Sequence, residues 1–113
     1  MRVLPASHAT VSVCMFAGAI TMVPYIDDIA MATILPALFS ANVGALSIEF
    51  ANPRHRHEYE ALKEHPLPAH MLLSPGVLDT TTNFVEHPQV VAKRLCEAVA
   101  AVGDKERIIA STD

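Results

Sequence analysis

The feature that most constrains this chain is the regular alternation of strand-like and helix-like segments. Apolar runs of strand length occur at 11–16, 45–50, 71–78 and 107–111. Between them, apolar residues recur every three or four positions, as in helices. Such an alternation predicts βαβ units, which build a parallel sheet. Pro75 and Gly76 interrupt the third run, so we expect that strand to be irregular or bulged.

The clearest predicted helix follows Pro88. Proline suits the first turn of a helix, because its missing N–H needs no partner there. Gly103 predicts the end of this helix. The expected apolar stripe faces the core and consists of Val91, Leu95, Ala98, Val99 and Val102. The residues expected to face water are Lys93, Arg94 and Glu97.

Two weaker helical patterns come earlier in the chain. Apolar residues at 29–39 have helical spacing, and Asp27 and Asp28 are candidate caps for that helix. Pro36 lies inside the pattern, so a kink or a restart is expected there. The polar stretch at 55–65 is predicted to be a third, short helix.

Four strands alternating with three helices predict about half of a (β/α)8 TIM-type barrel in the α/β class. A small open sheet is the alternative. Half a barrel would leave two strand edges and its interior face uncovered, so we expect a fragment of a larger barrel. The partial barrel is assigned to residues 25–113, and residues 1–24 are expected to form an atypical N-terminal segment that is either frame-shifted or disordered.

Composition excludes several classes of function. The chain has 113 residues, enough for one small domain, and its net charge is −4 without a cluster of Lys and Arg. Nucleic-acid binding is therefore not expected. The apolar run at 11–23 resembles a signal peptide but is too short to span a membrane. We expect a cytoplasmic protein in which Cys14 and Cys96 are free thiols.

Polar side chains stand where the expected strands end. Glu49 closes a short apolar strand, where a carboxylate is costly to bury without a partner. In a parallel barrel the carboxyl ends of the strands form the catalytic face. Glu49 therefore has four readings: a metal ligand, a general base, a partner of Arg54, or half of a purely structural ion pair.

The loops that follow these strands hold the other candidates. Arg54 and His55 lie in a partly cationic loop that can bind a substrate carboxylate, although a solvated loop is the alternative. Asp79 follows the third strand, where it can orient a substrate amine or cap the loop through backbone N–H groups. Asp113 lies at the tip of the fourth expected strand.

Six segments together resemble one family, cobalamin-independent methionine synthase, in its C-terminal catalytic domain and its shorter single-barrel members. They are Ile-Leu-Pro at 34–36, Asn-Val-Gly-Ala-Leu at 42–46, Phe-Ala-Asn-Pro-Arg-His at 50–55, Gly-Val-Leu-Asp-Thr-Thr-Thr-Asn at 76–83, Glu-His-Pro at 86–88 and Ala-Ser-Thr-Asp at 110–113. The resemblance implies a zinc-dependent methyltransferase that acts on a thiol, homocysteine, in methionine biosynthesis.

The resemblance also implies roles for individual residues. The family holds zinc with a His-x-Cys pair, a glutamate at a strand end and the cysteine of an Asp-Cys-Gly motif, and zinc then stabilises the substrate thiolate. Glu49 matches the glutamate ligand, and Asp113 matches the aspartate before the second cysteine. Asp79 is then the expected catalytic residue. Arg54, His55 and Asp113 are the expected substrate-binding residues.

Two departures from the family pattern stand out. The His-x-Cys pair is missing before Tyr25, and residues 14–24 admit codons that spell such a motif when read one base earlier. A frame error in the gene is therefore our hypothesis for this segment. Thr81 occupies the place of a histidine that protonates the methyl donor.

We consequently expect an inactive chain with an incomplete zinc site. Two alternatives stay open. The first is another thiol or alkyl-transfer enzyme of the same superfamily. The second is a non-enzymatic half-barrel that forms a homodimer through its exposed strand edges.

Overall fold

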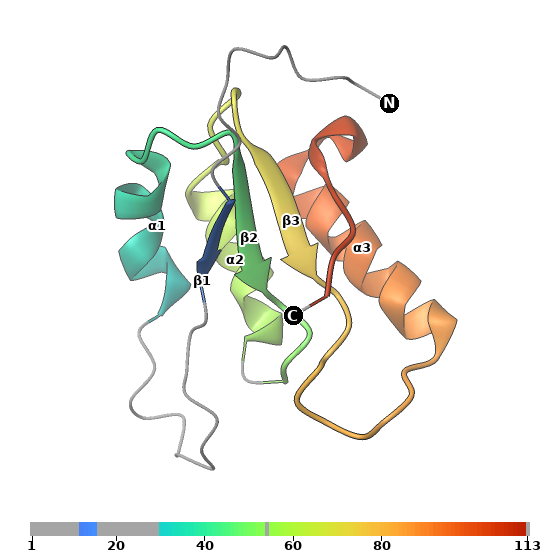
Figure 1. Ribbon diagram of the computed structural model, residues 1–113. Coiled ribbons are helices and arrows are strands. Elements are labelled where there is room, and N and C mark those ends of the chain that lie inside the picture. Colours follow the sequence, from blue (N-terminus) through green and yellow to red (C-terminus); the bar gives the residue numbers. More distant parts are fainter. Residues whose placement is uncertain (1–11, 16–29, 54, 113) are drawn as a thin grey trace.

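A three-stranded parallel sheet with helices between its strands forms the body of the protein (Figure 1). The computed structural model describes residues 12–15, 30–53 and 55–112. The strands, in the spatial order β1-β2-β3, are β1 (Ser12–Met15), β2 (Ala45–Glu49) and β3 (Leu72–Gly76). The helices are α1 (Met31–Phe39), α2 (Tyr59–Glu64) and α3 (Pro88–Val102), with 3-10 turns η2 (Arg56–Glu58) and η3 (Lys105–Arg107). The predicted alternation of strands and helices, with a parallel sheet, is confirmed.

The expectation of half a TIM-type barrel is wrong. The described strands make a small open sheet, and no barrel closure is seen among them. Beyond β3 the pairing consists of two isolated bridges, Leu73 with Ile108 and Gly76 with Ser111. The strand expected at 107–111 is therefore not formed. In its place the η3 turn is followed by an extended segment that touches β3 at these two points.

Pro75 explains why this fourth strand fails. Both bridges have the same register, because in each pair the partner lies 35 positions after the β3 residue. On this side of β3 the Ile109 N–H donates to the Leu73 carbonyl at 2.8 Å, and the Val77 N–H donates to the Ser111 carbonyl at 3.0 Å. A regular parallel ladder would place a bond from residue 75 to the Ile109 carbonyl between them. Proline has no N–H to donate, so the ladder is interrupted there.

The same geometry lets proline sit inside β3 without disturbing β2. Residues 45–49 pair with residues 72–76 one to one, without a bulge, so the expected irregularity of this strand is not found. The Leu72 N–H donates to the Gly44 carbonyl and the Phe50 N–H donates to the Gly76 carbonyl. Even-numbered residues of β3 thus bond to β2, and Pro75 presents its ring nitrogen to the other side.

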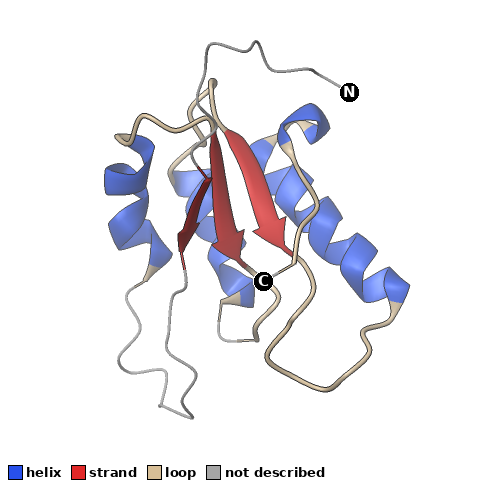
Figure 2. Cartoon of the chain, viewed as in Figure 1, coloured by secondary structure: helices blue, strands red, loops and turns tan. Residues whose placement is uncertain are grey.

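The core lies between the sheet and the helices. Figure 2 shows α2 behind the sheet, with α1 and α3 on either side of it. Leu46 and Ile48 of β2 are buried, whereas Ser47 and Glu49, which alternate with them, are half-buried. Helices therefore cover the face of the sheet that carries Leu46 and Ile48. The fully buried large side chains of the core include Leu35, Leu46, Phe50, Leu62, Met71 and Leu73.

Helices α1 and α3 differ in detail from their predicted forms. Helix α1 continues through Pro36 without a restart, and its expected caps, Asp27 and Asp28, lie outside the described residues. Helix α3 begins at Pro88 as predicted and ends at Val102, where Gly103 caps it with a positive φ of 82°. Arg94, expected to face water, is instead buried at 6% exposure.

Arg107 joins two segments that are distant in the sequence. Its Nη2 donates to the carbonyls of Leu67 at 3.1 Å and Met71 at 3.0 Å, and also to that of Pro68. Its Nε donates to the Met71 carbonyl as well, at 3.1 Å. A single guanidinium group thereby fastens the loop before β3 to the turn after α3.

Candidate functional site

Glu49 lies where the sequence places it, at the carboxyl end of β2. Its register partner is Gly76, the last residue of β3. The Glu49 side chain is half-buried. Within the part of the chain that the structure describes, its carboxylate makes no hydrogen bond or ion pair. Arg54, the ion-pair partner expected as one alternative, lies outside the described residues, so a pair with Arg54 and a cation-binding role both stay predictions.

His55, expected in a substrate-binding loop, is buried at 2% exposure. Its Nδ1 lies 3.0 Å from Oε2 of Glu58, which is also buried. Oε1 of Glu58 accepts a hydrogen bond from the Met31 N–H at 3.2 Å, at the start of α1. The pair of His55 and Glu58 therefore connects the segment after β2 to α1. Substrate binding by His55 stays a prediction.

Asp79 closes its own loop. Its Oδ1 accepts hydrogen bonds from the Thr81 N–H at 2.8 Å and from the Thr81 hydroxyl at 2.6 Å. This is the loop-capping role that the sequence left open for Asp79. Its second carboxylate oxygen makes no hydrogen bond among the described residues. A role toward a substrate amine stays a prediction.

An ion pair between buried Arg94 and half-buried Glu86, which is hydrogen-bonded to the Asp79 backbone, was not predicted from the sequence. The Asp79 N–H donates to Oε2 of Glu86 at 3.0 Å. Oε1 of Glu86 pairs with Nη1 of Arg94, which also donates to the Val77 carbonyl at 2.8 Å. The sequence does contain a signal for the burial of Arg94. This residue lies at helical spacing from three apolar residues of the same helix, Ala98, Ala101 and Val102. Arg94 was nevertheless predicted to face water because its side chain is charged.

The remaining predicted site residues are not described. Arg54 and Asp113 lie outside the described residues, as do residues 16–24, which make up most of the stretch where the His-x-Cys pair is expected. Among the described residues, no group of three or more His, Cys, Asp or Glu side chains is placed to hold a metal ion. Glu49 alone does not make a zinc site, so no chemical step through zinc follows from these residues.

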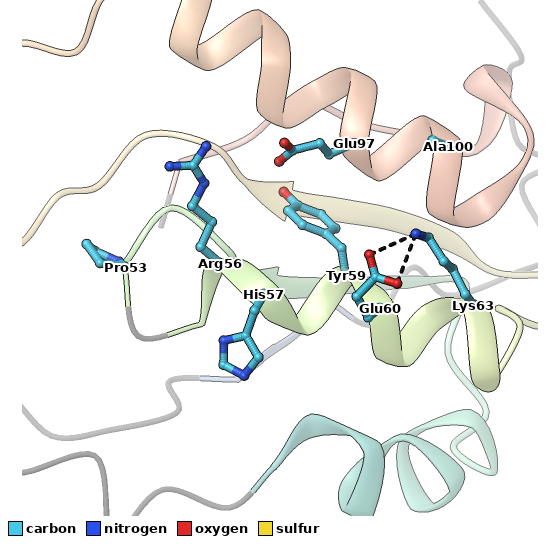
Figure 3. Close-up of a pocket in the computed structure, with 8 residues that line it drawn as sticks. All are labelled: Pro53, Arg56, His57, Tyr59, Glu60, Lys63, Glu97 and Ala100. Carbon is cyan, nitrogen blue, oxygen red and sulfur yellow. Dashed lines mark hydrogen bonds and ion pairs between the residues drawn. The ribbon is translucent and has the colours of Figure 1, made fainter.

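A separate cleft of about 540 Å³ lies between α2 and α3 (Figure 3). It contains neither Glu49 nor Asp79. In Figure 3 the Tyr59 hydroxyl points toward Glu97 on α3, and Lys63 pairs with Glu60 at 2.8 Å. Acidic and basic side chains alternate around the cleft, so its walls do not favour a ligand of one charge. The lining residues are Pro53, Arg56, His57, Tyr59, Glu60, Lys63, Glu97 and Ala100.

Comparison with known proteins gives no family assignment: no family model, no curated protein and no solved structure matches the chain. Among the residues that the structure describes, none of the helices has the length and apolar character needed to cross a membrane.

Proposed function

We propose that this chain is a cytoplasmic methyltransferase-like protein that resembles cobalamin-independent methionine synthase, with Glu49 as its zinc-binding carboxylate. The thiol of homocysteine is the proposed methyl acceptor of the lineage. The sequence segments at 42–46, 50–55 and 76–83 support the resemblance. The position of Glu49 is the structural observation that carries the proposal.

The surroundings of Glu49 support a ligand role. A carboxylate that is half-buried at a strand end needs a compensating partner, and none is found among the described residues. Carboxyl ends of neighbouring parallel strands meet at one edge of a sheet, which is where open α/β sheets bind ligands. Asp79 follows β3 by three positions, so two carboxylates share this edge.

The expected chemistry of the chain itself is limited. Glu49 is the single family ligand that we recognise in the sequence, whereas the resemblance implies a zinc site with four protein ligands. We therefore propose weak zinc binding and no methyl transfer to homocysteine. Transfer to a different thiol would instead support the alternative of another alkyl-transfer enzyme in the same superfamily.

Zinc titration against a chromophoric chelator tests the proposal. The purified chain should bind zinc, and Glu49→Gln should weaken the binding about tenfold or more, because the amide of glutamine is a poorer zinc ligand than a carboxylate. Glu60→Gln is the matched control, because Glu60 is an exposed carboxylate on α2. Equal zinc affinities for the chain and for Glu49→Gln would refute the assignment of Glu49.

A further inference from the structure

We propose that Glu86 and Arg94 are positioning residues for Asp79. In this view they hold the loop between β3 and α3 so that the Asp79 carboxylate meets a ligand amine at the carboxyl end of the sheet. The ligand side of this inference rests on the proposed function, in which the substrate is an amino-acid thiol. The positioning itself rests on the hydrogen bonds alone.

The bonds form a continuous path from helix α3 to Asp79. Nη1 of Arg94 donates to the Val77 carbonyl and pairs with Oε1 of Glu86, which fixes Glu86 against the end of β3. Oε2 of the same carboxylate then accepts the Asp79 N–H at 3.0 Å. Thr81 donates twice to Oδ1 of Asp79. Glu86 therefore holds the backbone of Asp79, and Thr81 orients its side chain.

Apolar packing does not hold this loop. Every residue from 80 to 85 is exposed, and Phe84 and Val85 are 83% and 99% exposed. The base of the loop is instead closed by the bond between the Asp79 N–H and Glu86. Hydrogen bonds to charged groups are the stronger kind in proteins, so this bond is suited to keep the backbone of Asp79 in one place.

A structural role alone does not require an arginine at position 94. Buried ion pairs are often no more stable than apolar residues of similar volume, and the neighbouring buried residue on this face of α3 is Ala98. Nε of Arg94 is buried without a hydrogen-bond partner among the described residues, which raises the free-energy cost of burying this side chain. The arginine makes two contacts that leucine or methionine would not: it donates to the Val77 carbonyl, and it pairs with the Glu86 carboxylate that accepts the Asp79 N–H.

The test compares Arg94→Met, Arg94→Lys and Glu86→Gln with the chain itself. Lys63→Met is the matched control, since it breaks an exposed ion pair on α2. Amide hydrogen exchange of Asp79, measured by NMR, reports the bond to Glu86. Titration with homocysteine, followed at the carboxyl carbon of Asp79, reports ligand binding. Thermal unfolding of each variant separates local from global effects.

We expect Arg94→Met to speed exchange of the Asp79 amide about tenfold or more, and to weaken homocysteine binding by a similar factor. Arg94→Lys should restore part of both. Lys63→Met should change neither. If Arg94→Met does not fold, Glu86→Gln gives the same comparison, because glutamine keeps the shape and an acceptor but loses the charge that pairs with Arg94.

Unchanged exchange of the Asp79 amide in Arg94→Met and Glu86→Gln would overturn the positioning role. An equal speeding of exchange at all amides, with a lower unfolding temperature, would overturn it too, because the pair would then serve global stability. Failure of the proposed function is seen separately. In that case the chain would not bind homocysteine, while the Asp79 amide would still depend on Arg94.

Discussion

Replacing Pro75 with valine tests why the segment after η3 meets β3 at only two isolated bridges. The substitution supplies an N–H at position 75, on the side of β3 that faces this segment. The flanking bonds, from the Ile109 N–H to Leu73 and from the Val77 N–H to Ser111, are already formed. The Ile109 carbonyl is therefore the expected acceptor, and the new bond would turn two bridges into one continuous ladder.

The net effect on stability should be small. One additional backbone hydrogen bond contributes about 0.5–1.5 kcal/mol. Loss of the proline ring gives the unfolded chain more freedom, which costs about 0.4–1 kcal/mol. These two contributions nearly cancel, so we expect the free energy of unfolding of Pro75→Val to stay within about 1 kcal/mol of that of the parent chain. The informative measurement is consequently local.

Amide hydrogen exchange measured by NMR provides that local measurement. The new amide at position 75 should be protected, and protection of the Ile109 amide should rise. Pro66→Val is the matched control, because Pro66 is exposed in the loop before β3 and its new amide should exchange freely. An unprotected amide at position 75, beside an Ile109 amide that is still protected, would refute the explanation that proline interrupts the fourth strand.

Two further substitutions test contacts elsewhere in the fold. Glu58→Ala removes the acceptor of the Met31 N–H and breaks the buried pair with His55, so it should destabilise the chain by about 3 kcal/mol in urea unfolding. Glu60→Ala, an exposed neighbour, should change stability by less than about 0.5 kcal/mol, and an equal loss in both would contradict the reasoning. Gly103→Ala should cost about 1–2 kcal/mol, because the φ of 82° is unfavourable for a residue with a Cβ. A Cβ at position 103 would meet no atom within 4 Å, so the cost comes from the backbone conformation alone. Gly103→Asn should therefore destabilise the chain less in the same assay, because asparagine adopts a positive φ more readily than alanine.

The order of elements was predictable because local signals mark it. Pro88 and Gly103 delimit α3, and the apolar runs at 45–49 and 72–76 are short enough to be strands. Each of these signals involves only a few neighbouring residues, so it can be recognised in the sequence without knowledge of long-range contacts. The position of Glu49 at the end of β2 follows from the same local pattern.

The extent of the sheet was not predictable in the same way. Pro75 was expected to distort β3 itself, yet β3 pairs regularly with β2. The effect of the proline falls on the next segment, because its ring nitrogen faces that side. Counting strand-like runs, including the one at 107–111, led to the half barrel, and such a count contains no information on which N–H groups find acceptors.

The polar contacts around the site were also not predicted from the sequence. Glu58 bonds to a residue 27 positions earlier in the chain, and no local pattern indicates that contact. Arg94 was assigned to the solvent because it is charged, although charged residues can be buried when they are paired. In both cases a long-range partner decides the burial, and the partner is known only once the chain is folded.

The contacts of Arg107 bear on how parts of the protein open together. One guanidinium group serves the carbonyls of Leu67, Pro68 and Met71. Separating the turn at 105–107 from the loop before β3 would break these hydrogen bonds at the same moment. Contiguous segments that share such contacts exchange their amide protons as one cooperative unit. The loop before β3 and the segment after α3 should therefore unfold in a single local step, although about 36 residues separate them along the chain.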